Sequence, residues 1–405
     1  MTDHATRAHP YMASSTDEAR NLMLKEIGVG DVSELFEQVP DEHISSPPRL
    51  PRALDSEVEL KRHILSLLNK NRTAEETLSF LGAGCWQHHV PAICDEIWSR
   101  SEFLTSVWGT PSSDHGRNQA WFEYASQLGE LVDMEFVGLP VYSWGAAVGH
   151  AMRMAARITD RNVVLVPEFL DPERLAIART YAGSPELSGH LELVSVRQSR
   201  ETGRLEIEDL QEKLSADVAA IYFENPSYLG IIEDAAEDIT AAARRAGAIT
   251  IAGVDPMSLG VIAPPGEFGA DIAVGSTQPL GVHMNGGGGV GGFIATRDEE
   301  RFAREYPTLQ VSITETIVEG ERGFGLILFE QSSYGSREKA NDWTGNSVYL
   351  WAIANAAYMS MMGPQGFRDL GKTIIQRSHF AAREISSVDG VSVRWPEGFF
   401  KEFVV

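Results

Sequence analysis

The sequence predicts an α/β fold with a mostly parallel sheet. From Asn162 onward, short apolar runs alternate with amphipathic stretches. Helices that connect parallel strands cover both faces of a sheet, and this arrangement produces such an alternation. The chain has 405 residues, 43% of them hydrophobic, so it is long enough for one large domain and a smaller one.

The spacing of the apolar residues defines the individual elements. We predict strands at residues 163–167, 191–196, 219–223 and 248–253. Amphipathic helices are expected between them, near residues 174–182, 207–214 and 235–246. Two more elements follow, an apolar segment at 269–275 and a helix at 347–362.

Three regions are expected along the chain. Residues 1–75 form a helical N-terminal segment with two capping-box patterns at helix starts. These patterns are Ser15 with Glu18 and Asp31 with Glu34. Residues 76–320 form the large α/β domain, and residues 321–405 form a small C-terminal α/β domain. The end of that domain, 400–405, reads as a strand, and since a strand needs a neighbour we expect the domain to be truncated.

Composition disfavours several classes of function. The net charge of −23 disfavours nucleic acid and anionic membranes as partners, because these bind proteins with surplus Lys and Arg.

Cys85 and Cys94 are too few for a disulfide framework, and we expect Cys94 to be a buried structural thiol. The pair His88 and His89 lacks a third metal ligand. There is no signal-peptide pattern and no run long enough to cross a bilayer, so we expect a cytoplasmic protein.

Candidate site residues follow the predicted strands, because ligands of parallel sheets bind at the carboxyl ends of the strands. Asn225 follows one strand, and Asp255 follows the next, with Ser258 in the turn after it. A carboxylate in the position of Asp255 suits the pyridine nitrogen of pyridoxal 5'-phosphate (PLP). An Asp before Pro256 is equally a helix N-cap, and this is the interpretation that we favour.

The amine that a PLP site needs is missing. No lysine lies between Lys213 and Lys339. Gln278 stands where a fold of the aminotransferase type carries the lysine that bonds the PLP aldehyde, and an amide nitrogen is not nucleophilic. Either the protein does not use PLP, or the lysine belongs to another chain. The glycine tract 286–292, including Gly286 and Gly287, offers backbone N–H groups, and we expect it to lie against a partner's cofactor rather than to act as a hinge.

Several motifs follow the pattern of one family. They are found at residues 79–84, 99–103, 122–124, 225–226, 255–260, 264–272, 322–324, 337–340 and 401–405. Together, in register over about residues 11–405, they resemble the first (alpha) subunit of the two-subunit glycine decarboxylase, the P-protein of the glycine cleavage system. The resemblance implies a PLP-dependent transferase of fold type I, the aminotransferase-like fold, whose alpha subunit lacks the lysine.

The resemblance also implies partners and a reaction. A beta subunit would carry the lysine and the covalently bound PLP, in a heterotetramer of two alpha and two beta subunits, with catalysis at their interface. The complex would decarboxylate glycine and pass the aminomethyl group to the lipoyl arm of the H-protein, as an oxidoreductase of amino-acid catabolism. The missing amine is then explained, because the chain is not active alone.

Three segments depart from the family pattern, and we expect them to be loops near the interface site. These are residues 108–116, 143–148 and 341–343. The first contains an acid and base pair, Asp114 with His115, which suits proton transfer. The alternative is a loop in which Asp114 caps a helix that begins near Arg117.

Two further candidates lie outside these segments, and two rival functions stay open. We expect His88 to be a donor at the rim of the site, and Arg337 to bind a phosphate or a carboxylate. The alternative for His88 is a solvated surface histidine, and the alternative for Arg337 is a surface ion pair.

The three segments that depart from the family pattern favour a paralogous complex that acts on another amino acid or amine. A catalytically inert scaffold or regulatory subunit is the second alternative.

Overall fold

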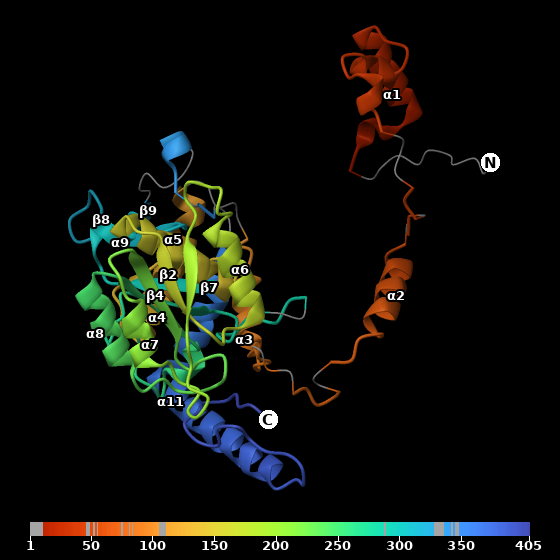
Figure 1. Ribbon diagram of the computed structural model, residues 1–405. Helices are drawn as coiled ribbons and strands as arrows, with labels where there is room; N and C mark the ends of the chain where they lie inside the picture. Colours follow the sequence, from red (N-terminus) through yellow and green to blue (C-terminus); the bar gives the residue numbers. More distant parts are fainter. Residues whose placement is uncertain are drawn as a thin grey trace. The chain divides into compact units, whose positions relative to one another are not determined.

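The computed structural model describes residues 11–45, 49–51, 53–54, 56–73, 76–80, 82, 84–104, 111–286, 289–327, 336–341, 343–344 and 348–405. Side chains are described for the same residues except 13, 111–116 and 326. The chain forms two compact units, Met1–Thr77 and Leu78–Val405 (Figure 1). The predicted boundary between a large domain and a small C-terminal domain, at residue 320, stays a prediction.

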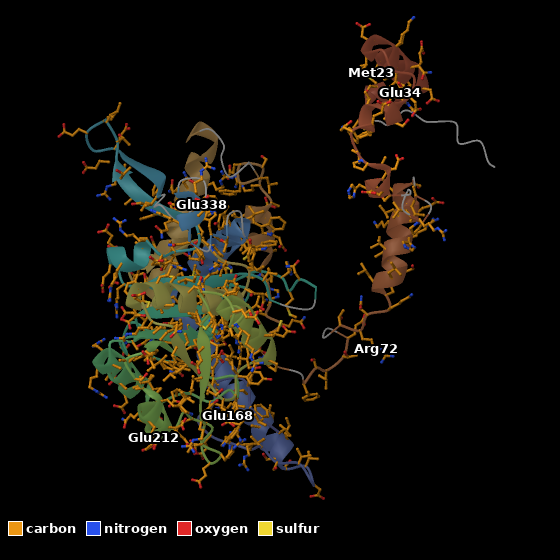
Figure 2. The ribbon with its side chains drawn as sticks, turned by 45° about the horizontal axis from the view of Figure 1, so that its top comes forward. Met23, Glu34, Arg72, Glu168, Glu212 and Glu338 are labelled. Carbon is orange, nitrogen blue, oxygen red and sulfur yellow. The ribbon has the colours of Figure 1, made fainter. Side chains whose placement is uncertain are left out.

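The described part of the first unit contains helices. It contains α1 (Asp17–Ile27), η2 (Val32–Phe36) and α2 (Glu57–Leu68). The predicted capping box of Asp31 and Glu34 is present, although it starts a 3-10 helix. The N-cap of α1 is Thr16, one residue after the predicted Ser15. Apolar side chains such as Met23 remain exposed in this unit (Figure 2).

A seven-stranded sheet forms the centre of the second unit, in the order β1-β7-β6-β5-β4-β2-β3. Strands β2 to β6 run parallel to one another, and β7 and β1 continue the sheet in antiparallel pairings. The mostly parallel sheet is therefore confirmed. The strands are β1 (Phe136–Val137), β2 (Val163–Pro167), β3 (Glu192–Val196), β4 (Val218–Glu224), β5 (Ile249–Val254), β6 (Ile272–Ser276) and β7 (Gly292–Thr296).

Helices cover both faces of this sheet, because successive side chains along each strand point to opposite faces. On β2, for example, Leu165 belongs to one hydrophobic core and Val164 to the other. The first core includes side chains of α3 (Ala92–Trp98), α4 (Pro111–Val132), α7 (Ile207–Lys213), α8 (Ala236–Ala246) and α11 (Tyr349–Ser386). The second includes α5 (Trp144–Thr159), α6 (Pro172–Ala182) and α9 (Glu300–Ala303). Figure 1 shows α7 and α8 on one side of the sheet and α6 on the other.

Two predictions about the end of the chain need correction. The helix expected at 347–362 continues as α11 to Ser386, across a kink at Gly363. The strand expected at 400–405 is wrong. This segment crosses a turn instead of pairing with a strand, since the Phe400 N–H donates to the Gly230 carbonyl at 3.1 Å. The periodicity also missed a separate hairpin of β8 (Gln310–Glu315) and β9 (Arg322–Ile327).

The burial of Cys94 and the exposure of acidic side chains agree with what the composition predicts. Cys94 is fully buried, which confirms a structural thiol, and burial raises its pKa to about 11. Many of the acidic side chains lie on the outside. Figure 2 labels Glu168, Glu212 and Glu338 on the second unit, and all three are exposed. Such a surface favours solubility.

Helices α5 and α6 pack closely because two glycines of α5 face α6. A Cβ at Gly145 would lie 2.7 Å from the Ile177 side chain, and one at Gly149 would overlap the ring of Tyr181. The segment 143–148 is therefore the buried start of a helix and not the loop that we expected. The close contact brings the first turns of the two helices together at the carboxyl edge of the sheet.

We predict that Gly149→Ala lowers the free energy of unfolding in urea. Alanine inside a helix normally gains about 0.5–1 kcal/mol over glycine, but overpacking against Tyr181 costs about 1–3 kcal/mol. Gly325→Ala is the matched control, because no atom lies within 4 Å of its Cβ position. A variant Gly149→Ala as stable as the wild type would contradict the close approach of α5 and α6.

Candidate functional site

The residues predicted to follow adjacent strands do meet at the carboxyl edge of the sheet. Glu224 ends β4 and pairs in register with Gly253 of β5, which leads to Asp255. A pocket at this edge is lined by Trp86, Trp144, Arg174, Pro226, Ser227, Tyr228, Gly230, Asp255, Phe400, Lys401 and Glu402. Two ion pairs lie at this edge. The pair of Arg174 and Glu224 is buried, whereas in the pair of Asp255 and Lys401 the aspartate is buried and the lysine is half-buried.

The first ion pair joins Arg174 of α6 to Glu224. The Arg174 Nε lies 2.9 Å from Glu224 Oε1, and Nη2 donates to Oε2 at 3.3 Å. The Tyr222 hydroxyl donates to Glu224 Oε1 at 2.6 Å. The guanidinium also lies over the ring of Trp144, 4.1 Å from its centroid. All of these side chains are buried. The guanidinium and the carboxylate have therefore lost their hydrating water, and their contact with each other compensates for that loss.

The second ion pair joins Asp255 to Lys401. Asp255 Oδ1 accepts from the Met257 N–H at 3.1 Å and caps η4 (Pro256–Ser258), which confirms the N-cap interpretation. Asp255 Oδ2 lies 2.7 Å from Lys401 Nζ. Burial lowers the pKa of Lys401, while the carboxylate opposes this shift by favouring the ammonium form.

Two further groups contact the Lys401 ammonium. It lies 3.3 Å from the centroid of the Trp86 ring and 3.2 Å from His88 Nε2. Burial lowers the pKa of His88 to about 4, and the ammonium of Lys401 adds to this effect. The imidazole is therefore neutral at pH 7. An ammonium has only hydrogens to offer, so His88 Nε2 accepts from it.

Lys401 is the residue that sequence reasoning missed. It belongs to the motif at 401–405, but that segment was read as a strand, and its lysine was given no role. The local sequence carries no signal of its distant partners. Only the excess of buried carboxylates at the strand ends, Glu224 and Asp255, indicated that cations were needed here.

Gly82 and Gly84 lie against Glu402, one of the residues that line the pocket. Gly82 and Gly84 have φ of +55° and +72°, and a Cβ at Gly82 would lie 2.7 Å from Glu402 Oε1. That oxygen accepts from the Gly84 N–H at 3.4 Å. Burial raises the pKa of Glu402, although the Lys401 ammonium opposes the shift.

The space left inside the pocket is small. The part enclosed by its lining residues measures about 10 Å³, room for about one water molecule. Tyr228, Lys401 and Glu402 also line a neighbouring, more open pocket of about 800 Å³. The carboxylate of Asp255 has the chemistry to bind a pyridine nitrogen, but its free oxygen is already paired with Lys401. PLP does not fit this pocket as it stands.

Three predicted cofactor residues support the backbone around the pocket. Gln278 is buried and its Nε2 donates to the Val282 carbonyl at 2.9 Å. The Ser258 hydroxyl donates to the Asp255 carbonyl at 2.7 Å. Asn225 Oδ1 accepts from the Glu233 N–H at 3.1 Å. Among the predicted cofactor residues that the structure describes, only Asp255 lines the cavity.

The other predicted site residues lie elsewhere or outside the described side chains. Asp114 and His115 lie in α4, which begins at Pro111. The expected loop at 108–116 is therefore wrong from Pro111 onward, and so is the alternative that Asp114 caps a helix near Arg117. The side chains of Asp114 and His115, and Gly287, fall outside the described part. Gly286 has φ of +59°, and Arg337 is exposed on η5 (Arg337–Lys339). Their functional roles stay predictions.

Metal and membrane features can be judged for the described residues alone. There, no group of three or more His, Cys, Asp or Glu side chains is arranged to hold a metal ion. Within the same ranges, no helix has the length and apolar character needed to cross a membrane.

The fold and its edge pocket define a chain of fold type I, the aminotransferase-like architecture of PLP-dependent enzymes. The cysteine desulfurase of Thermococcus onnurineus shares this fold, with a TM-score of 0.55 at 16% identity, over 82% of this chain and 79% of that one. The likeness is closer to the crystal structure of glycine decarboxylase (P-protein) of the glycine cleavage system in inhibitor-bound form. There the TM-score is 0.84 at 33% identity, over 97% of this chain and 86% of that one.

Sequence comparison leads to the same family. Residues 9–404 match the family described as glycine cleavage system P-protein. The chain is 39% identical to the probable glycine dehydrogenase (decarboxylating) subunit 1 of Aeropyrum pernix, over 98% of this chain and 86% of the relative. The chain belongs to the glycine cleavage system P-protein family, and the resemblance seen in its motifs is confirmed.

We predict that Arg174→Met strongly destabilises the protein, because it leaves Glu224 as an uncompensated buried charge. The loss in the free energy of unfolding should be about 3–5 kcal/mol. The double variant Arg174→Met/Glu224→Gln should lose less, since both charges are gone. Arg179→Met, on the exposed side of the same helix, is the control in urea denaturation. If Arg174→Met loses no more free energy of unfolding than Arg179→Met, the structural role of the ion pair is contradicted.

We also predict a stability difference at acid pH that depends on His88. Its pKa is about 4 in the folded protein and about 6.5 in an unfolded chain, so the unfolded state takes up the proton first. The stabilisation is complete above about pH 6.5 and is lost as the pH falls to about 4.

The measurement compares the wild type with His88→Gln, which keeps an acceptor but cannot titrate. Between pH 6.5 and 4, the free energy of unfolding of the wild type should fall by about 1–3 kcal/mol more than that of the variant. The exposed neighbour provides the control variant His89→Gln. Identical slopes for the wild type and His88→Gln would contradict the assignment.

Proposed function

We propose that this chain is the lysine-less alpha subunit of a two-subunit glycine decarboxylase. The complex converts glycine and the lipoyl H-protein to the aminomethyl-lipoyl H-protein and carbon dioxide. The observation that carries the proposal is Gln278. This member of the family has an amide, and no amine, just after β6. The Gln278 amide is hydrogen-bonded to the Val282 carbonyl in the turn that follows. The relative's name, "subunit 1", supports a second subunit.

The partner is a beta subunit that carries the lysine and the PLP, in a heterotetramer of two alpha and two beta subunits. Two observations support this division. No lysine lies between Lys213 and Lys339, and the Asp255 oxygen that could pair with a pyridine nitrogen is already paired with Lys401. When bound in the partner, PLP supplies the electron sink for decarboxylation.

The residues of this chain would shape the interface pocket and exclude water from it. We assign proton transfer to Asp114 and His115, in the first turns of α4, and substrate-carboxylate binding to Arg337. Gly286 and Gly287 would admit the partner's cofactor, because glycine has no Cβ. His88 suits proton transfer less well, since its Nε2 already accepts from Lys401.

The paralogue that acts on another amino acid or amine loses part of its support. Among the departures from the family pattern, the segment 143–148 serves this chain's own interior. The Ser143 hydroxyl accepts from the Ala146 N–H at 3.2 Å and caps α5. Trp144 packs under Arg174. A change that serves packing carries no information about the substrate.

Co-expression with the lysine-bearing subunit of the same family tests the proposal. The pair together should exchange the carboxyl carbon of glycine with bicarbonate, and neither subunit alone should do so. After borohydride reduction, the PLP should be attached to the partner. Exchange by the partner alone at the full rate would favour the scaffold alternative. A reduced PLP adduct on this chain, formed in isolation, would overturn the proposal.

A further inference from the structure

We propose that Lys401 is an internal cation that fills this chain's own cofactor-type pocket and locks the segment 398–402 to the edge of the sheet. Its ammonium occupies the charge partner position on Asp255 that a pyridine nitrogen takes in fold type I. The pocket is therefore closed to PLP by a side chain, in addition to lacking a lysine at Gln278.

The carboxylate requires a cation at this place. Asp255 is 2% exposed and stands at the end of a fully buried strand, where an unpaired charge is strongly unfavourable. Its Oδ1 is used by the N–H of Met257, which leaves Oδ2 to be neutralised. Lys401 Nζ does this at 2.7 Å.

The ammonium is itself fully provided with partners. Three groups surround its three N–H bonds, namely Asp255 Oδ2, His88 Nε2 and the face of Trp86. The Trp86 ring packs against Trp144, with 6.1 Å between their centroids. The two indoles thus each carry one cation, the half-buried Lys401 on Trp86 and the buried Arg174 on Trp144.

The backbone that carries Lys401 is held on both sides. The Ile232 N–H donates to the Gly398 carbonyl at 2.7 Å, and the Phe400 carbonyl accepts from the Ser378 hydroxyl at 2.7 Å. The His379 ring stacks on Phe399, with 3.9 Å between centroids. A Cβ at Gly230 would overlap the Glu402 backbone, so the segment lies directly on that turn. Lys401 is a fixed element of the pocket and not a mobile surface side chain.

Lys401→Ala tests the proposal on the full chain. Asp255 then faces an empty space, and the Tm should fall by roughly 5–15 °C. Propylammonium chloride should raise the Tm of this variant in a saturable manner, because the cation refills the site, and should leave the wild type unchanged. Neutral 1-propanol is the matched control for the ligand, and Lys372→Ala, an exposed lysine on α11, is the control for the variant.

A second set of variants keeps the test decisive if Lys401→Ala fails to fold. Lys401→Met retains most of the side-chain volume and removes the charge, so it should be strongly destabilised. The double variant Lys401→Met/Asp255→Asn should recover most of the lost Tm. No recovery in the double variant, or equal stabilisation by propylammonium and 1-propanol, would overturn the proposal.

Uptake of a cofactor analogue tests the closed pocket directly. Pyridoxine 5'-phosphate has no aldehyde and cannot react with surface lysines, so equilibrium dialysis reports the pocket alone. The wild-type chain should take up none, and stoichiometric binding would overturn the inference. None of these measurements involves glycine. A result that contradicts this inference is therefore distinguishable from a failure of the proposed function.

Discussion

The ion pair between the buried Asp255 and Lys401 is the interaction on which the edge of the sheet depends. A carboxylate at the end of a buried strand has lost its water and needs a cation within reach. Lys401 provides it from a segment that is remote in the sequence, and its ammonium also fixes Trp86 and His88. Three separate parts of the chain therefore meet at a single charge.

The pair of Arg174 and Glu224 applies the same principle one strand further along. Its guanidinium enters from α6, whose position is set by the close contact of α5 with α6. The helix packing and the charge pairing thus depend on each other. A displaced α6 would expose Glu224, and an unpaired Glu224 would weaken the contact. In this chain, side chains of the fold type I domain itself stabilise the carboxyl edge of the sheet.

Much of this fold could be predicted from the sequence, and the reason for the failures is specific. Periodicity identified the parallel strands, and the convergence of their carboxyl ends identified Asp255. Lys401 was missed because its partners are far away in the sequence, and its segment was read as a strand although it lies on the turn at Gly230. Gly145 was expected in a loop, because the segment 143–148 departs from the family pattern, whereas Gly145 and Gly149 both lie in α5. In this protein they permit a close helix contact.

The internal cation has a consequence for ligand linkage. A fold that binds a free ligand gains stability with ligand concentration, by mass action. Lys401 is covalently part of the chain, so its effective concentration at Asp255 is constant. The stability of this edge is therefore independent of the supply of vitamin B6.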